Sequence, residues 1–431
     1  MKDRDSLLND ETDSADALPL GALPPAGVFQ RWLRRQMLAR LAALEHGRLA
    51  VRDPLGSASF GPAEAAEVRV QIKDLSAWRD MATGGTIGAA EAYMAGKWTT
   101  ADLTGLVRLF VANRAMMQGF ERGLASLAAP LLGLSHRLRR NTRTQARRNI
   151  GAHYDLGNEF YQLFLDRTMS YSAVIYPRPE STLDEAAVHK LDTVCRKLDL
   201  QPTDHLLEIG TGWGGLALHA ARRYGCRVTT TTISARQREY SLARVREAGL
   251  EQQITVLDQD YRDLRGSFDK LVSIEMIEAV GLDFLPGYFR ACADRLQPGG
   301  RMLLQSIVIA DHLYEEARRS VDFIQKYIFP GGALPSVSVI ESLARQVGLR
   351  RSGIDDIGAH YARTLRDWRE RFMAQQPAVR TLGFTDEFIR LWEFYFAYCE
   401  GGFLERAIGN VQVVFEKSLA EELLQVQAGP T

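Results

Sequence analysis

Leu207-Glu-Ile-Gly-Thr-Gly-Trp-Gly-Gly215 ends an apolar run in a glycine-rich turn led by an acidic residue, and this pattern indicates the fold class. Glycines lack the side chains that would keep a ligand away from the backbone. In open α/β sheets, ligands bind at the carboxyl ends of strands. The spacing Glu-x-Gly-x-Gly-x-Gly differs from the Gly-x-Gly-x-x-Gly of dinucleotide-binding folds. We expect a nucleoside-containing ligand here; a tight turn without a ligand is the alternative.

Strands and helices alternate around this turn. Apolar and β-branched runs predict strands over five segments with helical patterns between them: His205–Gly210, Cys226–Thr232, Ile254–Asp260, Phe268–Glu275 and Arg301–Ile309. This rhythm predicts a parallel sheet covered by helices on both faces. Residues 311–350 and 360–405 are expected to add helices, and Val411–Lys417 is expected to add a late edge strand.

Polar residues at the strand ends indicate which cofactor binds. The second predicted strand ends in threonines, whereas a strand that holds the ribose of NAD ends in Asp or Glu. Glu208 is placed to anchor an ammonium group, and Asp260 with Tyr261 is placed to bind near an adenine. The pattern therefore predicts S-adenosylmethionine as the cofactor and a methyltransferase as the class of enzyme.

The composition argues against nucleic-acid binding, a disulfide framework and a metal site. Lys+Arg and Asp+Glu each number 53 among 431 residues, so no net field favours nucleic acid. The four cysteines are widely spaced and include no Cys-x-x-Cys, which predicts free thiols in a reducing compartment. No His, Cys and Asp cluster has metal-ligand spacing, so we expect no metal.

The chain is expected to have four parts. These are a disordered acidic tail (1–25), a small N-terminal α+β domain (26–125), a basic linker (126–150) and a catalytic domain (151–431). Six arginines and no acidic residue lie between residues 137 and 148. They form either a solvated linker or a segment held against anionic headgroups. Without a signal peptide or a run long enough to span a bilayer, we expect a cytoplasmic protein peripheral to the inner face of the membrane.

A set of motifs in order along the chain resembles the cyclopropane-fatty-acyl-phospholipid synthase family, which includes the mycolic acid cyclopropane synthases. The matching stretches are His153–Glu159, Met169–Ser172, Leu207–Gly215, Thr232–Gln237, Gln259–Asp263, Lys326–Gly332 and Asp367–Phe372, and residues 85–98 look like the family's N-terminal lipid-handling module. The resemblance implies a class I methyltransferase (Rossmann-like) sheet with helical lid insertions. It also implies methyl transfer to the double bond of an unsaturated acyl chain in a membrane phospholipid, giving a cyclopropane fatty acid.

The resemblance assigns cofactor contacts to matching positions. These are Tyr171 and Ser172 in the preceding loop, Gly210, Gly212 and Gly214 in the turn, Thr232, Ile233 and Gln237 on the ribose side, Asp260 and Tyr261 at the adenine, and Ile274 and Glu275 lining the cleft. Aromatic residues of the C-terminal third are candidates for the walls of an acyl tunnel: Tyr327, Phe329, Trp368, Phe372, Trp392, Phe394, Tyr395 and Phe396.

The catalytic set departs from the family pattern. In the family, bicarbonate accepts the last proton and is held by a Cys, a Glu, a His and a Tyr. Glu278 and Tyr361 match two of these positions, but Ala173 replaces the Cys and Gln305 replaces the His. Either bicarbonate is still held by Glu278, Gln305 and Tyr361, or Glu278 accepts the proton directly. Replacing Glu278 with Gln is expected to reduce turnover sharply in both cases.

Other functions stay open at this point. If the ring does not close, the product is a methyl-branched or methylene fatty acid. A small-molecule N- or O-methyltransferase needs no acyl tunnel, and a noncatalytic lipid-binding protein could keep the fold. The expected partner is an anionic phospholipid bilayer. The oligomeric state stays open, with a homodimer among the alternatives.

Overall fold

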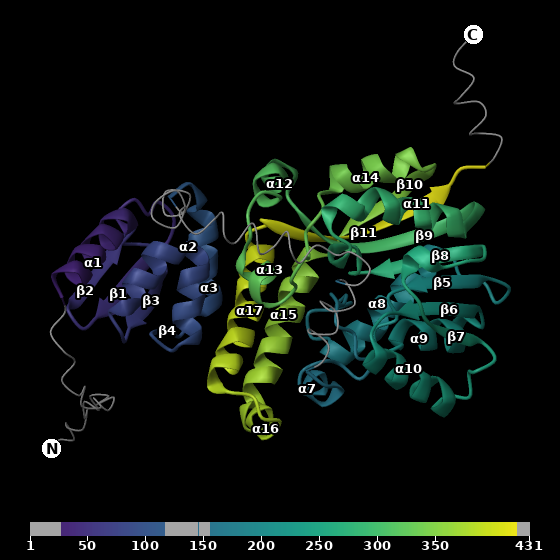
Figure 1. Ribbon diagram of the computed structural model, residues 1–431, viewed down its shortest axis with the longest axis horizontal. Coiled ribbons are helices and arrows are strands. Elements are labelled where there is room, and N and C mark those ends of the chain that lie inside the picture. The colour runs from purple at the N-terminus through teal and green to yellow at the C-terminus, as the bar shows by residue number, and fades with distance from the viewer. Residues whose placement is uncertain (1–26, 117–144, 146–155, 420–431) are drawn as a thin grey trace, which may run out of the picture.

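The computed structural model describes residues 27–116, 145 and 156–419. They form two α/β bodies joined along one long helix, as Figure 1 shows. The expected acidic tail lies outside the described residues. So does the arginine-rich segment, apart from Gln145.

The first body is a small α+β unit built from elements between Val28 and Ala112. Its sheet has the order β2-β1-β3-β4. Alternate residues of the sheet, such as Leu49 and Val51, are buried against Leu33 and Met37. The elements are α1 (Val28–Leu41), β1 (Arg48–Asp53), β2 (Gly56–Phe60), β3 (Glu67–Ile72), α2 (Ser76–Met94), β4 (Trp98–Thr100) and α3 (Leu103–Ala112).

The second body is built on a seven-stranded sheet of order β10-β11-β9-β8-β5-β6-β7. The five strands from β9 to β7 are parallel, which confirms the predicted doubly covered α/β sheet. The strands are β5 (His205–Ile209), β6 (Arg227–Thr232), β7 (Ile254–Asp258), β8 (Phe268–Ile274), β9 (Leu296–Ile309), β10 (Leu349–Asp356) and β11 (Ile408–Lys417). The helices next to them are α8 (Leu183–Leu198), α9 (Gly215–Tyr224), α10 (Ala235–Glu247), α11 (Leu285–Arg295) and α14 (Val337–Gln346), with short 3₁₀ turns η2 (Tyr261–Asp263), η3 (Ile277–Ala279) and η4 (Leu282–Phe284).

The prediction of a late edge strand over Val411–Lys417 is wrong in its position. Strand β11 lies inside the sheet, antiparallel to β9 on one side and to β10 on the other. The edge is β10, over residues that carried no strand pattern. Along β10 only Leu349 is buried, so the alternation that reveals a strand is missing there.

The remaining helices cover the carboxyl ends of the parallel strands. They are α7 (Asn158–Gln162), α12 (Asp311–Ala317), α13 (Phe323–Tyr327), α15 (Gly358–Ala374), α16 (Gln376–Thr381) and α17 (Asp386–Leu404). Helix α17 also packs on α2 and α3 and so joins the two bodies (Figure 1). Tyr93 donates to Glu393 at 2.7 Å, and Thr104 donates to Glu400 at 2.8 Å. No helix among the described residues is long and apolar enough to cross a membrane.

Candidate active site

The glycine turn leaves the end of β5 and forms one wall of a cavity. Gly210 and Gly212 have φ of 100° and 52°, values that favour glycine. A Cβ built on Gly212 would meet no atom within 4 Å, so this position is open to the cavity. Gly214 begins α9 at a φ of 82°, and its Cβ would approach the Ser241 side chain at 3.2 Å. Gly214 therefore shapes the turn instead of lining the cavity.

A buried carboxyl group lies below this turn. Thr230 donates to Glu208 at 2.6 Å, and the hydroxyls of Thr230 and Thr211 are 2.7 Å apart. Burial raises the pKa of Glu208 to about 8. A cationic amino group would stabilise the charged form of this carboxyl group. Glu208 thus fits the predicted anchor for the ammonium end of S-adenosylmethionine.

The ribose-side residues lie at the end of β6. Thr232 donates to the Gln237 side chain at 3.1 Å and accepts from the Ser234 amide. Thr232, Ile233 and Gln237 all line the cavity, as do Tyr171 and Ser172. Their hydroxyl and amide groups suit a ligand with ribose hydroxyls.

At the predicted adenine position, Asp260 lies beside Tyr261 on the cavity wall. Two guanidinium nitrogens of Arg262 bond the Asp260 carboxylate at 2.7 and 2.6 Å, so part of its acceptor capacity is already used. The Tyr261 ring packs against Tyr288 at 5.4 Å between centroids. Tyr261 is therefore held in place as a flat wall for a purine.

One cavity of about 1710 Å³ connects the glycine turn with the interior of the N-terminal domain. Its far end is lined by apolar side chains of that domain, including Leu49, Val70, Ile72 and Trp78. Among the expected tunnel aromatics, Phe329, Phe394 and Tyr395 line it. Trp368, Phe372, Trp392 and Phe396 are buried in the helical core.

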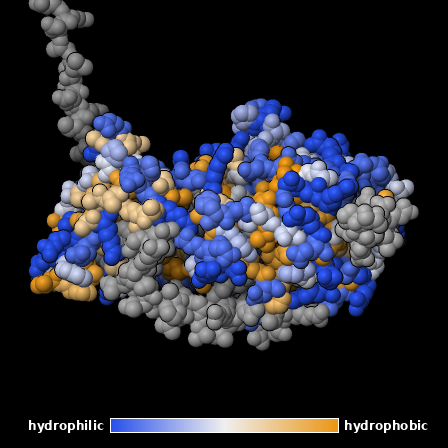
Figure 2. Space-filling view, turned by 90° about the horizontal axis from the view of Figure 1, so that it is seen from above, coloured by the Kyte–Doolittle hydropathy of each residue, from blue (hydrophilic) through white to orange (hydrophobic). Residues whose placement is uncertain are grey.

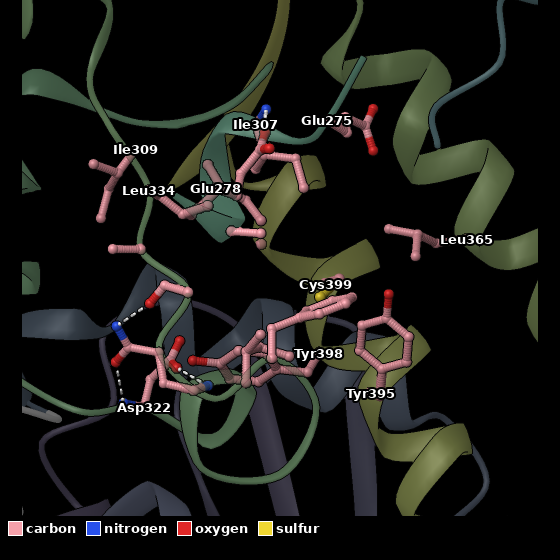
Figure 3. A pocket seen from close by; sticks show the side chains of 18 of the residues that line it. Glu275, Glu278, Ile307, Ile309, Asp322, Leu334, Leu365, Tyr395, Tyr398 and Cys399 are labelled. Atoms are coloured by element: carbon pink, nitrogen blue, oxygen red, sulfur yellow. Dashed lines mark hydrogen bonds between the residues drawn. The ribbon is translucent and has the colours of Figure 1, made fainter. Parts of the chain in front are cut away.

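Two glutamates lie where the cofactor end meets the apolar part of the cavity. Figure 3 shows Glu275 and Glu278 on one side, with Tyr395, Tyr398 and Cys399 of α17 across from them. Glu275 directly follows β8, and Glu278 lies on the 3₁₀ turn η3. The prediction that Glu275 lines the cleft agrees with its position.

Glu275 is surrounded by hydrogen-bond donors. Its Oε1 accepts from the Ala173 amide at 2.9 Å, from Gln305 Nε2 at 2.8 Å and from Asn410 Nδ2 at 2.6 Å. Burial raises the pKa of Glu275, and these hydrogen bonds act in the opposite direction. The Tyr361 hydroxyl also acts to lower the pKa of this carboxyl group.

Glu278 has fewer partners. Its Oε1 accepts from Ser306 Oγ at 3.1 Å and from the Ile307 amide at 2.5 Å, while Oε2 is buried without a partner. Burial, together with the nearby charge of Glu275, raises the pKa of Glu278 to about 8. Near neutral pH, Glu278 therefore holds a proton that an exposed glutamate would have lost.

Gln305 lies behind Glu275 and does not line the cavity. It is fully buried in the middle of β9, where it lies opposite Gln412 of β11. The structure therefore places the predicted catalytic Gln305 against Glu275 and away from the cavity. Tyr361 does reach the cavity wall, and Ala173 contributes its backbone amide and carbonyl to Glu275 and Gln305.

Sequence reasoning missed three polar side chains, two behind the site and one on the cavity wall. Asn410 and Gln412 lie two residues apart on β11 and are fully buried among valines. Such a pair of amides in an apolar strand is a signal that could have found them, because alternate residues share one face. The third is Lys190, which is buried and donates to Ser172 Oγ at 3.1 Å.

The comparisons with known proteins agree with this geometry. A family model described as mycolic acid cyclopropane synthetase matches residues 141–413. The chain belongs to this family.

Members of the mycolic acid cyclopropane synthetase family resemble the chain along most of its length. Tuberculostearic acid methyltransferase UfaA1 of Mycobacterium tuberculosis is 36% identical over 92% of this chain and 92% of its own length. Cyclopropane-fatty-acyl-phospholipid synthase of Escherichia coli K12 is 33% identical over 83% of this chain and 90% of its own. The solved structure of mycolic acid cyclopropane synthase CmaA1 with SAH and CTAB has a TM-score of 0.60 and 30% identity, covering 63% of this chain and 98% of that one.

Family membership confirms three predictions. The fold is that of a class I methyltransferase, the protein is an enzyme, and its methyl donor is S-adenosylmethionine. The residues around the glycine turn fit this cofactor, because Gly212 leaves open space and Glu208 offers a buried carboxyl group. Within the described residues, no group of three His, Cys, Asp or Glu could hold a metal ion, and the four cysteines are free thiols.

Proposed function

We propose that the protein transfers a methyl group from S-adenosylmethionine to the double bond of an unsaturated fatty acyl chain of a membrane phospholipid. The observation that carries this proposal is the single cavity joining the glycine turn, the two glutamates and an apolar interior. Its size suits a long hydrocarbon chain together with the cofactor. The CTAB in the solved structure of the relative CmaA1 is itself a long-chain molecule, which supports the same reading.

The lining of the cavity supplies three things that this reaction needs: exclusion of water, stabilisation of a cation and a proton acceptor. The cofactor supplies an electrophilic methyl group, which a double bond attacks, leaving positive charge on the acyl chain. Apolar walls exclude water, which would otherwise trap that charge. Phe394 and Tyr395 line the cavity, and the face of an aromatic ring can stabilise a nearby cation. An acceptor must then remove one proton from the chain.

Two products are compatible with this site, and each has its own support. A cyclopropane fatty acid follows if the proton leaves the new methyl group and the ring closes; the family model and the Escherichia coli relative support it. A methyl-branched or methylene fatty acid follows if the charge is resolved without ring closure. The similarity to tuberculostearic acid methyltransferase and the replacements at Ala173 and Gln305 support that outcome.

A lipid-dependent assay tests the proposal against the other functions. The purified protein is incubated with S-adenosylmethionine and vesicles of mono-unsaturated phospholipid. We expect S-adenosylhomocysteine to accumulate, and none to form with fully saturated vesicles. Cofactor binding without turnover would indicate a noncatalytic lipid-binding protein. Turnover only with soluble amines or alcohols would indicate a small-molecule methyltransferase.

We also propose that α1 holds the protein against the bilayer on its cytoplasmic face. Val28, Phe29 and Trp32 are exposed, with Phe29 and Trp32 stacked at 6.0 Å between ring centroids. Arg31 and Arg35 are exposed beside them. Hydrophobic surface is visible at this end of the molecule in Figure 2. Exposed aromatic and basic side chains on one helix are typical of interfacial binding.

This surface leads to a prediction for vesicle binding. Replacing Phe29 and Trp32 with Ser should weaken binding to anionic vesicles by about tenfold or more, since aromatic burial contributes over ~1 kcal/mol per residue. High salt should weaken wild-type binding, because the arginines act through screened charges. Leu382→Ser, at an exposed leucine elsewhere on the surface, is the control and should bind like the wild type. Equal binding of the double variant in a sedimentation assay would contradict the role of α1.

A further inference from the structure

Glu275 adopts a backbone conformation that is costly for its residue type. Its φ is 47°, in the left-handed region that favours glycine. A residue with a side chain costs about 1 kcal/mol there. Such strain is characteristic of functional positions, where the surrounding structure holds it in place. The fold therefore keeps a carboxyl group at a backbone conformation that favours glycine.

The hydrogen bonds around Glu275 have a fixed direction, with the carboxylate as the acceptor. The Lys197 ammonium, which can only donate, bonds Gln412 Oε1 at 2.6 Å. Gln412 Nε2 must then donate to Gln305 Oε1, at 2.9 Å, so that Gln305 presents its own N–H group to Glu275. The Ala173 amide can also only donate. Glu275 is consequently held as an acceptor.

The position of Glu275 brings it close to both reactants. It lines the cavity directly beyond β8, which lies beside the strand that carries the glycine turn. The next residue, Met276, lies within 3.3 Å of the point where a Cβ on Gly210 would stand. Leu365 of α15 also lines the cavity and is drawn on the same side as Glu275 in Figure 3. Glu275 and the glycine turn thus line the same cavity, on neighbouring strands of the sheet.

We propose that the carboxylate of Glu275 is the base that removes the last proton from the methylated acyl chain. The inference rests on the proposed function. A bond forms between the methyl carbon and one alkene carbon as the sulfur–methyl bond breaks, leaving positive charge on the other alkene carbon. Glu275 then takes a proton from the new methyl group or from a neighbouring carbon. The electron pair of that C–H bond closes the ring or forms a new double bond.

This assignment differs from both alternatives derived from the sequence. Glu278, the residue expected to accept the proton, has two donors on one oxygen and an unpartnered second oxygen. Bicarbonate would be dispensable, because a carboxylate of the chain itself already occupies the converging donors. The protein is therefore expected to work at full rate in bicarbonate-free buffer.

The test uses two variants, Glu275→Gly and Glu275→Gln, in bicarbonate-free buffer with unsaturated vesicles. Both should lose about a thousandfold in turnover, in the range of general-base catalysis. Glu275→Gly relieves the strain at this φ but leaves three donors without their acceptor, so a cooperative thermal melt is recorded to show that the variant is folded. Turnover is measured at saturating S-adenosylmethionine, so that the loss reports the chemical step and not cofactor binding.

Added formate or bicarbonate completes the test. A small oxoanion fits the space freed in Glu275→Gly and meets the same donors, so it should restore part of the turnover there. It should not restore Glu275→Gln, whose amide still fills that space. Turnover of Glu275→Gln within about tenfold of the wild type, or a wild type that depends on bicarbonate, would overturn the assignment. A wild type inactive on every unsaturated lipid would instead overturn the proposed function itself.

Discussion

Replacing Gly212 with Leu should weaken S-adenosylmethionine binding by about a hundredfold, which corresponds to about 2.7 kcal/mol. The cause is steric. A side chain on Gly212 would meet no protein atom within 4 Å, because this position faces the cavity. A leucine would therefore occupy the volume that the cofactor needs, at little cost to packing. Isothermal titration with the purified variant measures the change.

Gly249→Leu is the matched control. Gly249 also has a positive φ, 66°, and a Cβ there would likewise meet nothing within 4 Å. It follows α10, is exposed and does not line the cavity. Both variants should lose similar stability from the left-handed backbone, about 1 to 2 kcal/mol, but only Gly212→Leu should lose cofactor affinity. Unchanged affinity of Gly212→Leu would show that the cofactor does not lie along this turn.

Glu278→Gln should stabilise the protein by a few kcal/mol at pH 9 and by almost nothing at pH 4. Burial and Glu275 raise the pKa of Glu278 from 4.5 to about 8. Between these two values the folded state holds a proton that the unfolded chain has released, so stability falls as pH rises through this window. Glutamine cannot ionise and removes that loss. Thermal melting of both proteins from pH 4 to pH 9 measures it.

The same variant bears on catalysis. The amide oxygen of the introduced glutamine can accept from Ser306 and Ile307 as the glutamate does, and a glutamine amide resembles the protonated acid. We expect turnover near neutral pH within about tenfold of wild type, a much smaller loss than at Glu275. This reverses the expectation from the sequence. The control for the melting experiment is Glu239→Gln, at an exposed carboxyl group. A difference in melting temperature between wild type and Glu278→Gln that does not change with pH would contradict the proton on Glu278.

The sequence predicted the parts of the fold that have local signals. The strands of the parallel core and the turn at Leu207–Gly215 follow from apolar runs and glycine spacing, and the structure has them at nearly the same bounds. The position of β11 inside the sheet was not predictable, because strand order depends on pairing between distant segments. Strand β10 was missed because only Leu349 of its residues is buried.

In the candidate site, too, the features with a local sequence signal were predicted and those that depend on distant segments were not. Glu278, Tyr361 and Gln305 were identified from the sequence as candidate catalytic residues. Glu278 and Tyr361 line the cavity. The role proposed for Glu275 could not be predicted, because it depends on a backbone angle and on donors that converge from distant segments. Asn410, one of these donors, is 135 residues away in the chain. Only the folded sheet brings it next to the carboxylate.

The most direct test of methyl transfer to an acyl double bond is mass spectrometry of the lipids after incubation with S-adenosylmethionine labelled as CD3. The account predicts that label enters the unsaturated acyl chains and stays out of the headgroup. Chains that retain CD2 indicate that the proton left the methyl group, as in a cyclopropane or a methylene product, and chemical derivatisation separates these two. Chains that retain CD3 indicate a methyl-branched alkene. Label only in the headgroup, or none in the lipids despite bound cofactor, would contradict the account.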